Sequence, residues 1–482
     1  MRTGEHHKGK VRLNRRTVIV LLSVFIALFT VDALAATRYV RDGGSGGSPC
    51  TGDWSDACDS FGTALGASSN GDVIYVADGN YTSTVFNTTG ITVKKCYDGE
   101  GTCDGVANWQ TSYGDGQGVF SGTWDVNVAD ITIDGGYRDT NDWTDETAYG
   151  FYVTNASHGF RVGENQAGSA GSAHNFTLRY TAVNPGDGRH DGIYINGTSY
   201  PSSNYGKVQY CYIYDAGRTN VLGRGVNYWL FEYNFMGDSC KGTSSSIHGE
   251  AISIYGSGTN NYNTFRYNYW VDWGDDIGEN GSTGGIMMGD ASYVFVYGNV
   301  FTSSEQFSNN GVLGSWSGYT STNWRVYNNT FINTPDNVNV LTINSTFTGS
   351  VVRNNAFFNN SAEAISNSTQ SNQATDGTDF GNNTQTDLTN IFATTKNGGY
   401  DFRITSATDI GYTLTNETVG GLYHTYETDM DGTTRGSDGN WDRGAFEYNT
   451  TPTPTNTITG VTIGNLQTIE ELISWNRSDG LR

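Results

Sequence analysis

Short runs of alternating apolar and polar residues recur along the chain, and most end in an aromatic residue followed by asparagine. Phe231-Glu-Tyr-Asn234, Phe265-Arg-Tyr-Asn268 and Phe295-Val-Tyr-Gly-Asn299 are three of them. Alternation with a period of two predicts β-strands. No stretch between the runs keeps a period of 3.6 residues, which excludes a leucine-rich or helical repeat.

The runs are spaced as a structural repeat. When they are aligned, equivalent positions fall at residues 181, 211, 234, 268, 299, 329 and 355, with separations of 30, 23, 34, 31, 30 and 26 residues. Periods of roughly 20–50 residues indicate a solenoid. We therefore expect an all-β chain of stacked coils, each with three short strands and three turns. The recurrent asparagines should stack as a ladder at one of the turns.

The two ends of the repeat region carry further motifs. Residues 38–46 are followed by Gly71-Asp-Val-Ile-Tyr-Val-Ala-Asp-Gly-Asn-Tyr81, and the last motif runs from Asp429-Met-Asp-Gly-Thr-Thr-Arg435 to Asp442-Arg-Gly-Ala-Phe-Glu-Tyr448. With the repeat, these segments resemble the right-handed parallel β-helix proteins of the pectate-lyase-like superfamily. The resemblance covers nearly all of residues 36–448. It implies a short capping helix near Ser60–Ser68, but this fold serves lyases, hydrolases, tailspikes and adhesins alike.

The first 35 residues have the pattern of a secretory signal peptide. Arginines at positions 12, 15 and 16 precede an apolar run over residues 17–31, and Ala33-Leu-Ala35 is a small-x-small cleavage signal. A signal anchor retained in the membrane is the alternative, although the run is short for a full span. We expect a secreted protein, or one held at the cell surface.

The composition changes after the last motif. Residues 449–458 form a Thr/Pro-rich linker, and residues 459–482 are too few for a domain. We interpret them as a short tail left from a truncated module, through which the protein would attach to a cell surface. Residues 36–448 are thus expected to form one β-helix domain.

The net charge narrows the range of partners. It is −22 for the whole chain, and removal of residues 1–35 leaves 21 basic and 47 acidic side chains, a net charge of −26. Such a chain lacks the basic surface that nucleic-acid binding requires. It also repels polyanions, so an acidic polysaccharide would need bound calcium or a local cluster of arginines.

Six cysteines fit an exported protein. They are close in sequence in two cases and about one coil apart in the third, which predicts the disulfides Cys50–Cys58, Cys96–Cys103 and Cys211–Cys240. A zinc site is the alternative, but the spacings are not those of a zinc motif.

Charged residues gather at three turns that we expect to precede the same strand of successive coils. Asp191, Asn220 and Glu250 are 29 and 30 residues apart. We therefore expect them to stack at the interstrand spacing of about 4.8 Å. The predicted catalytic residues are Arg189, His190, Asp191, Arg218, His248 and Glu250, and Asn220 is predicted to bind substrate.

The next long turn is acidic. Asp275, Asp276 and Glu279 could supply the carboxylate oxygens of a Ca²⁺ site, with a solvated turn as the alternative. Nearby aromatic residues could stack on sugar rings, and those predicted to bind substrate are Trp273, Trp316 and Tyr319.

These residues predict a protein that acts on a polysaccharide. A lyase that cleaves a uronate-containing glycan by β-elimination needs a cation beside the uronate carboxylate, a base and a proton donor, which the Arg, His and Ca²⁺ candidates could provide. A glycoside hydrolase of the same fold needs two carboxylates, and Asp191 and Glu250 would lie about 9–10 Å apart, near the inverting geometry. A non-catalytic carbohydrate-binding or adhesive surface protein is the third possibility. The catalytic lysine of chondroitinase-like β-helices and the polygalacturonase-like motif set are not found, so no known catalytic set is transferred.

Overall fold

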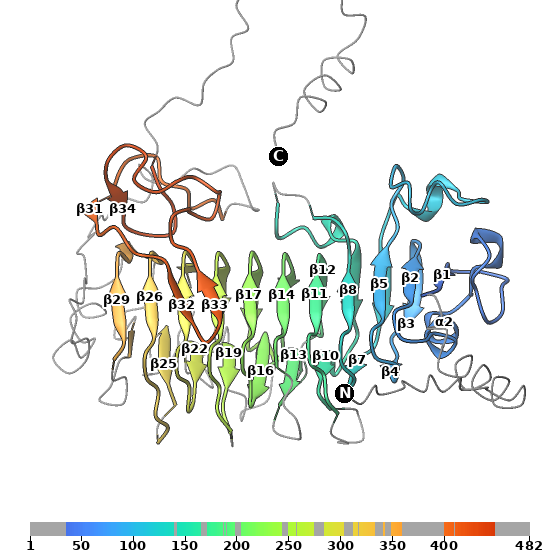
Figure 1. Ribbon diagram of the computed structural model, residues 1–482, viewed down its shortest axis with the longest axis horizontal. Helices are drawn as coiled ribbons and strands as arrows, with labels where there is room; N and C mark the ends of the chain where they lie inside the picture. The colour runs from blue at the N-terminus through green and yellow to red at the C-terminus, as the bar shows by residue number, and fades with distance from the viewer. Residues whose placement is uncertain are drawn as a thin grey trace, which may run out of the picture.

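The computed structural model describes residues 35–138, 142–164, 171–186, 188, 190–197, 204–242, 249–256, 258–273, 284–302, 312–316, 318–332, 341–342, 349–358, 400–408 and 410–448. These residues form a right-handed parallel β-helix in which each coil adds one strand to each of three parallel sheets (Figure 1). The predicted fold is confirmed. The predicted signal peptide, the linker and the tail lie outside the described residues, apart from Ala35. No described helix is long and apolar enough to cross a membrane.

Sheets A, B and C follow one another along each coil and have eleven, ten and nine strands. Sheet A contains β1 (Thr37–Val40), β2 (Val73–Val76), β5 (Thr92–Lys95), β8 (Thr132–Asp134), β11 (Thr177–Arg179), β14 (Lys207–Gln209), β17 (Leu230–Glu232), β20 (Thr264–Arg266), β23 (Phe295–Tyr297), β26 (Arg325–Tyr327) and β29 (Val351–Arg353). Sheet B contains β3 (Gly79–Thr82), β6 (Gly118–Ser121), β9 (Phe151–Thr154), β12 (Thr181–Asn184), β15 (Tyr212–Ile213), β18 (Phe235–Ser239), β21 (Tyr269–Trp273), β24 (Val300–Thr302), β27 (Thr330–Ile332) and β30 (Ala356–Phe358). Sheet C contains β4 (Val85–Phe86), β7 (Trp124–Val126), β10 (His158–Val162), β13 (Asp191–Asn196), β16 (Val221–Arg224), β19 (Glu250–Ile254), β22 (Gly284–Met288), β25 (Leu313–Ser315) and β28 (Leu341–Thr342).

The core is a stack of apolar side chains that point inward from all three sheets. In sheet A, Phe231 pairs with Phe265 and Phe265 with Val296, and all three are fully buried. The two phenyl rings stack with their centroids 5.1 Å apart. Full burial of one such side chain contributes about 1.5–3 kcal/mol, so the coils are held together along the whole axis by one continuous core.

The predicted asparagine ladder occupies the turn between sheets A and B. The side-chain amides of Asn234, Asn268, Asn299, Asn329 and Asn355 bond one to the next at 2.9–3.0 Å. Each amide also donates to a backbone carbonyl of a neighbouring coil, as Asn299 does to Phe265. These bonds satisfy polar groups that the turn would otherwise leave buried and unpaired.

A short helix closes the N-terminal end. Helix α2 (Phe61–Gly66) begins after Ser60, whose side chain accepts a hydrogen bond from the Thr63 N–H at 3.2 Å. Phe61 packs on the rings of Phe120 and Trp124, so the helix covers the open end of the core. The predicted capping helix is confirmed over a shorter range. Three 3₁₀ turns complete the helical elements of the described chain: η1 (Trp54–Asp56), η2 (Thr111–Tyr113) and η3 (Glu146–Ala148).

Two of the three predicted disulfides are present. Cys50–Cys58 and Cys96–Cys103 have Cα separations of 5.4 and 5.7 Å. The third was wrong, because Cys211 and Cys240 are not joined. Tyr212 pairs with Phe235, so Cys211 aligns with Asn234, and Cys240 lies six residues further along. That offset is roughly 20 Å of extended chain, far beyond the Cα separation of about 4.4–6.8 Å that a disulfide requires.

The last motif forms a closing segment, defined here as residues 400–408 and 410–448. It contains the antiparallel pairs β31 (Ile410–Gly411) with β34 (Trp441–Asp442) and β32 (Glu417–Val419) with β33 (Leu422–His424). Tyr400 and Phe402 pack on sheet B, and His424 and Tyr426 pack on sheet A. In Figure 1 the strands of sheet C run along the lower edge, whereas β31 and β34 lie at the opposite edge.

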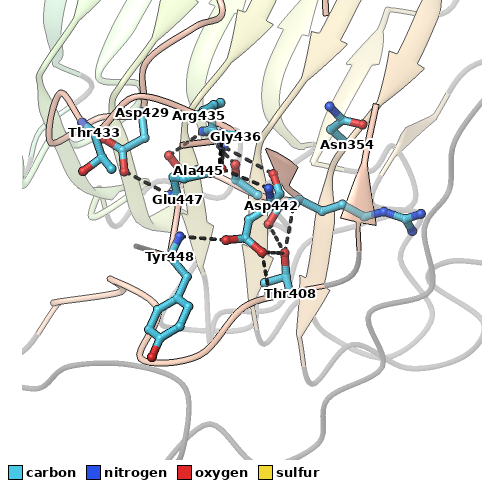
Figure 2. Close-up of polar contacts among 12 residues, drawn as sticks. Asn354, Thr408, Asp429, Thr433, Arg435, Gly436, Asp442, Ala445, Glu447 and Tyr448 are labelled. Carbon is cyan, nitrogen blue, oxygen red and sulfur yellow. Dashed lines mark hydrogen bonds and ion pairs between the residues drawn. The ribbon is translucent and has the colours of Figure 1, made fainter. Parts of the chain in front are cut away.

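A buried network of ionisable side chains and backbone groups holds the closing segment together (Figure 2). Arg435 donates to the carbonyls of Gly444 and Ala445 and lies 3.5 Å from the Glu447 carboxylate. Three carboxylates accept backbone N–H groups: Asp429 from Thr433 at 2.7 Å, Asp442 from Tyr448 at 2.7 Å, and Glu447 from Asp442 at 2.9 Å. This network is the physical reason for the motif seen in the sequence.

Candidate functional site

The charged residues of the sequence gather where sheet B turns into sheet C. His158 pairs with Asp191, and Glu250 pairs with Gly284. Ile193 pairs with Val221 and Val221 with Ile252, so Thr219 is the residue aligned with Asp191 and Glu250. The residues aligned at this corner are therefore His158, Asp191, Thr219, Glu250 and Gly284.

Asn220 is one residue out of register with this row. It is fully buried and its Nδ2 donates to the Gly237 carbonyl at 3.2 Å. A slip of one residue turns a side chain to the other face of a sheet. The predicted substrate contact at Asn220 was therefore wrong, and its side chain belongs to the interior.

Asp191 is the centre of the polar cluster. Its carboxylate is fully buried and accepts from Arg218 Nε at 2.7 Å, from Arg218 Nη2 and from Thr219 Oγ1 at 2.9 Å. His158 Nδ1 lies 3.1 Å from Asp191 Oδ2. The Arg218 and His158 side chains are 31% and 19% exposed, so one buried anion holds two side chains that reach the surface.

The charges set the ionisation of this cluster. Burial alone would raise the pKa of Asp191, but the hydrogen bonds from Arg218 and His158 outweigh it and lower the pKa below its usual range. Burial would lower the pKa of Arg218, yet the bonds to Asp191 raise it. Asp191 is therefore an anion and Arg218 a cation throughout the physiological range.

His158 is oriented for proton transfer. With the Asp191 carboxylate beside Nδ1, the favoured tautomer carries its proton on Nδ1 and leaves Nε2 as an acceptor. The His158 ring stacks on Tyr194 at a centroid distance of 5.4 Å. Burial raises the pKa of Tyr194, so its phenol stays protonated and can act as a donor.

A second outward row continues across sheet C. Arg224 Nη2 lies 3.4 Å from the Tyr255 hydroxyl, and its guanidinium lies 5.2 Å from the centre of the Tyr255 ring. The Tyr255 and Trp316 rings meet at 6.4 Å in an edge-on arrangement. Tyr319 lies over Gly289, where a Cβ atom would come within 2.8 Å of its ring. The predicted aromatic residues Trp316 and Tyr319 thus lie just beyond the last residue of strand β25, whereas Asp191 lies at the first residue of β13.

The other predicted residues have different surroundings. His190 directs Nδ1 toward the Pro185 carbonyl at 3.3 Å, and its own carbonyl accepts from the Arg218 N–H. Glu250 is 1% exposed and lies two strands from Asp191. Trp273 is fully buried in the core beside Phe301, so the predicted sugar platform at Trp273 was wrong. It ends β21 with its ring turned inward.

Several predicted residues fall outside the described part of the chain. They are Arg189 and His248 of the catalytic set and all three calcium candidates, Asp275, Asp276 and Glu279. Among the residues that the structure describes, no group of three His, Cys, Asp or Glu side chains is placed to hold a metal ion. The calcium site stays a prediction.

The sequence analysis missed His158, Tyr194, Arg224 and Tyr255. A signal for the first was present, because His158-Gly-Phe160 has the same form as Asp191-Gly-Ile193 one coil later. Extending that phrase gives Thr219-Asn-Val221 and Glu250-Ala-Ile252, which is the register observed. Tyr194 and Tyr255 carry no such signal, because outward tyrosines are frequent in this chain.

Comparisons with known proteins add the following. No protein-family model and no curated protein matches the sequence. Solved structures match at low similarity. The tailspike protein gp49 of Acinetobacter baumannii bacteriophage Fri1, a capsular polysaccharide depolymerase, is 11% identical with a TM-score of 0.35, over 61% of this chain and 54% of that one. The catalytic unit of a GH87 alpha-1,3-glucanase from Streptomyces thermodiastaticus strain HF3-3 is 13% identical with a TM-score of 0.38, over 68% and 57%. XylC in complex with xylose is 12% identical with a TM-score of 0.37, over 67% and 75%. This chain thus spans just over half the length of the first two.

Proposed function

We propose that the protein is a secreted polysaccharide lyase, related to the pectate-lyase-like superfamily, that cleaves a uronate-containing glycan on the outer face of sheet C. The observation that carries the proposal is the attachment of Arg218 and His158 to the single buried carboxylate of Asp191. The two intact disulfides fit an oxidising, extracellular compartment.

The geometry supports β-elimination as follows. Arg218 pairs with the uronate carboxylate and stabilises the negative charge that grows there as the C5 proton leaves. His158 Nε2 takes that proton, and the electron pair forms the C4=C5 double bond. The bond from C4 to the glycosidic oxygen breaks, and the leaving oxygen takes a proton from the Tyr194 phenol. The products are an unsaturated uronate and a new end on the other fragment.

Hydrolysis through Asp191 is less well supported. A glycoside hydrolase needs a carboxylic acid whose pKa is raised so that it stays protonated. The pKa of Asp191 is lowered, its oxygens already accept hydrogen bonds from Arg218 and Thr219, and His158 Nδ1 lies 3.1 Å from one of them. Asp191 is better suited to positioning Arg218 and His158 than to donating a proton.

The rest of sheet C offers a binding surface. Tyr255 follows β19 and Trp316 follows β25, which are one and three strands beyond β16, the strand that follows Arg218. At about 4.8 Å per strand, the surface from β10 to β25 spans roughly 24 Å. Sugar rings would pack on the aromatic side chains, so a polymer would contact several coils at once.

The test is a screen of the secreted protein against acidic and neutral polysaccharides, with and without calcium. We expect the ultraviolet absorbance of unsaturated uronates to rise with one acidic substrate and to be lost in Arg218→Ala. Arg179→Ala is the matched control, because Arg179 forms a comparable pair with Asp134 at 2.6 Å on sheet A. A calcium requirement would support the predicted site at Asp275, Asp276 and Glu279.

Two other results would redirect the assignment. New reducing ends without ultraviolet absorbance would make the protein a hydrolase and overturn the elimination chemistry. Binding to a polysaccharide with no cleavage of any substrate would instead identify a non-catalytic carbohydrate-binding protein.

A further inference from the structure

A row of stacked tyrosines borders sheet A at the turn that follows sheet C. Tyr205, Tyr228, Tyr262 and Tyr293 stand two residues before β14, β17, β20 and β23. Successive rings are 4.8, 4.8 and 5.1 Å apart and nearly parallel. We call these four residues the tyrosine row.

The backbone of this row is not one that tyrosine favours. All four residues have φ between 57° and 64°, a left-handed conformation that Asn, Asp and Gly adopt more readily. The flanking coils do use Asp130, Asn175 and Asn323 at the same position, with φ of 55° to 60°. The turn alone therefore does not explain the tyrosines, and their rings must supply the reason.

The row opens onto a cavity under the closing segment. The cavity has a volume of about 160 Å³ and lies between Tyr205 and Tyr228 on one side and Leu422–His424 of strand β33 on the other, over Lys207, Leu230 and Arg266. An engineered cavity of about 150 Å³ takes up benzene, so this one has the size of a single six-membered ring.

Two exposed aromatic side chains face this cavity. Tyr205 is 50% exposed and Tyr423 is 64% exposed, and they are two of the five large apolar or aromatic side chains that the described residues expose. Tyr205 ends the row, because the preceding coil has Asn175 there, so at this position the described residues place no aromatic ring on its outer side. The Tyr423 hydroxyl accepts a hydrogen bond from Asn416 at 3.1 Å, which fixes its ring.

The polar lining points to an acidic ligand. Lys207 is exposed at the floor of the cavity, and Arg266 lies beside it, bonded to Glu232 at 2.5 Å and to the Tyr297 hydroxyl at 3.0 Å. Because Arg266 is already paired with Glu232, Lys207 supplies the positive charge of the cavity. In a chain with a net charge of −22, this cation beside exposed aromatic rings favours a ligand with an apolar face and a negative charge. A uronate ring has both.

We propose that this cavity is a second carbohydrate site, which binds one acidic pyranose unit without cleaving it. The ring packs on Tyr423 and Tyr205, and the carboxylate pairs with Lys207. The site lies on sheet A, away from the Asp191 cluster on sheet C, so it would hold the polymer at a distance from the bond that is cleaved. The choice of a uronate rests on the proposed function.

The experiment is affinity electrophoresis in gels that contain pectate, alginate, hyaluronan, chondroitin sulfate or the neutral polymer hydroxyethylcellulose. Arg218→Ala is the background, so that the gel is not digested. We expect retardation by at least one acidic polymer, and about tenfold weaker binding after Tyr423→Ala or Lys207→Gln. Tyr205→Asn should weaken binding to a similar extent. It introduces the residue type that occupies this position in flanking coils, so the backbone of the turn should not change. Tyr137→Ala, which removes a tyrosine that is 54% exposed elsewhere, should change nothing.

The outcomes separate this proposal from the proposed function. No retardation by any acidic polymer would overturn the second site, as would retardation that survives Tyr423→Ala, Lys207→Gln and Tyr205→Asn but is lost in Trp316→Ala. If the wild-type protein released no unsaturated product while the tyrosine variants still lost retardation, the site would stand and the lyase assignment would fall.

Discussion

The Asp191 carboxylate is held by the Arg218 guanidinium through two hydrogen bonds, one to each carboxylate oxygen. The carboxylate is fully buried and the guanidinium is partly exposed. The planar guanidinium of an arginine matches a carboxylate in this way. Replacing Arg218 by lysine, or Asp191 by asparagine, would therefore lose at least one of the two bonds.

Asp191→Asn should therefore reduce activity strongly without unfolding the protein. Arg218 and His158 would lose the anion that orients them, and we expect kcat to fall by about 100-fold or more and stability by about 2 kcal/mol. Initial rates and denaturant unfolding would measure the two effects. Asp134→Asn, which breaks the Arg179 pair on sheet A, should leave the rate unchanged. A fully active Asp191→Asn variant would remove the basis of the assigned site.

The closing segment should lose stability as the pH rises. Burial raises the pKa of Glu447 from 4.5 to about 7 and also raises those of Asp429 and Asp442. A raised pKa means that the folded state binds the proton more tightly than the unfolded state. The stabilising effect of this proton on Glu447 is complete below pH 4.5 and disappears as the pH rises through about 7.

The free energy of unfolding of the wild-type protein should then be about 2 kcal/mol lower at pH 8 than at pH 5 because of Glu447. Glu447→Gln should reduce this difference, at lower stability overall, because an amide N–H would face a backbone donor. The control is Glu427→Gln, at an exposed side chain. An unchanged pH dependence in Glu447→Gln would show that the burial of this carboxylate does not control the segment.

The asparagine ladder should be costly to interrupt. Asn299→Ala would remove the side-chain oxygen that accepts from the Asn268 backbone N–H and the side-chain amide that donates to the Phe265 carbonyl in a buried turn. Each buried unsatisfied group costs about 1–3 kcal/mol, so we expect a loss of at least 3 kcal/mol, measured by thermal and denaturant unfolding. Asn87→Ala, at an exposed position, should cost less than about 0.5 kcal/mol. Equal losses in both variants would contradict the ladder's role.

Cys211 should react with thiol reagents only after unfolding. Its side chain is buried, and burial raises the pKa of the thiol to about 12, so little thiolate forms at neutral pH. Peptide mapping after alkylation in denaturant without reductant should find Cys211 labelled and the two N-terminal disulfides intact. A linked Cys211–Cys240 peptide would contradict the observed register.

The fold could be predicted from the sequence because its signals are repeated. The Asn268 and Asn299 positions recur with the same aromatic and apolar neighbours, so their alignment needs no knowledge of the turns between them. The site could be predicted only in part. Arg218 and Asp191 were identified because they are charged residues in a chain with few charges.

The errors at Asn220 and Cys240 have one physical cause. Coil length varies from 23 to 34 residues, because the turns differ in length. A separation of 29 residues can therefore mean adjacent coils in register, as was assumed for Cys211 and Cys240, or a large offset along the strand. Only the pairing of strands, such as Ile193 with Val221, fixes which residues are neighbours.

The position that holds the tyrosine row has a consequence for engineering. Asp130, Asn175, Tyr228 and Asn323 occupy it with nearly the same backbone, so the side chain there can change while the main chain does not. Substitutions at this position could place a chosen side chain on each successive coil, at intervals of about 4.8 Å along the molecule. The solenoid would then be a scaffold that holds aromatic or charged groups at fixed intervals.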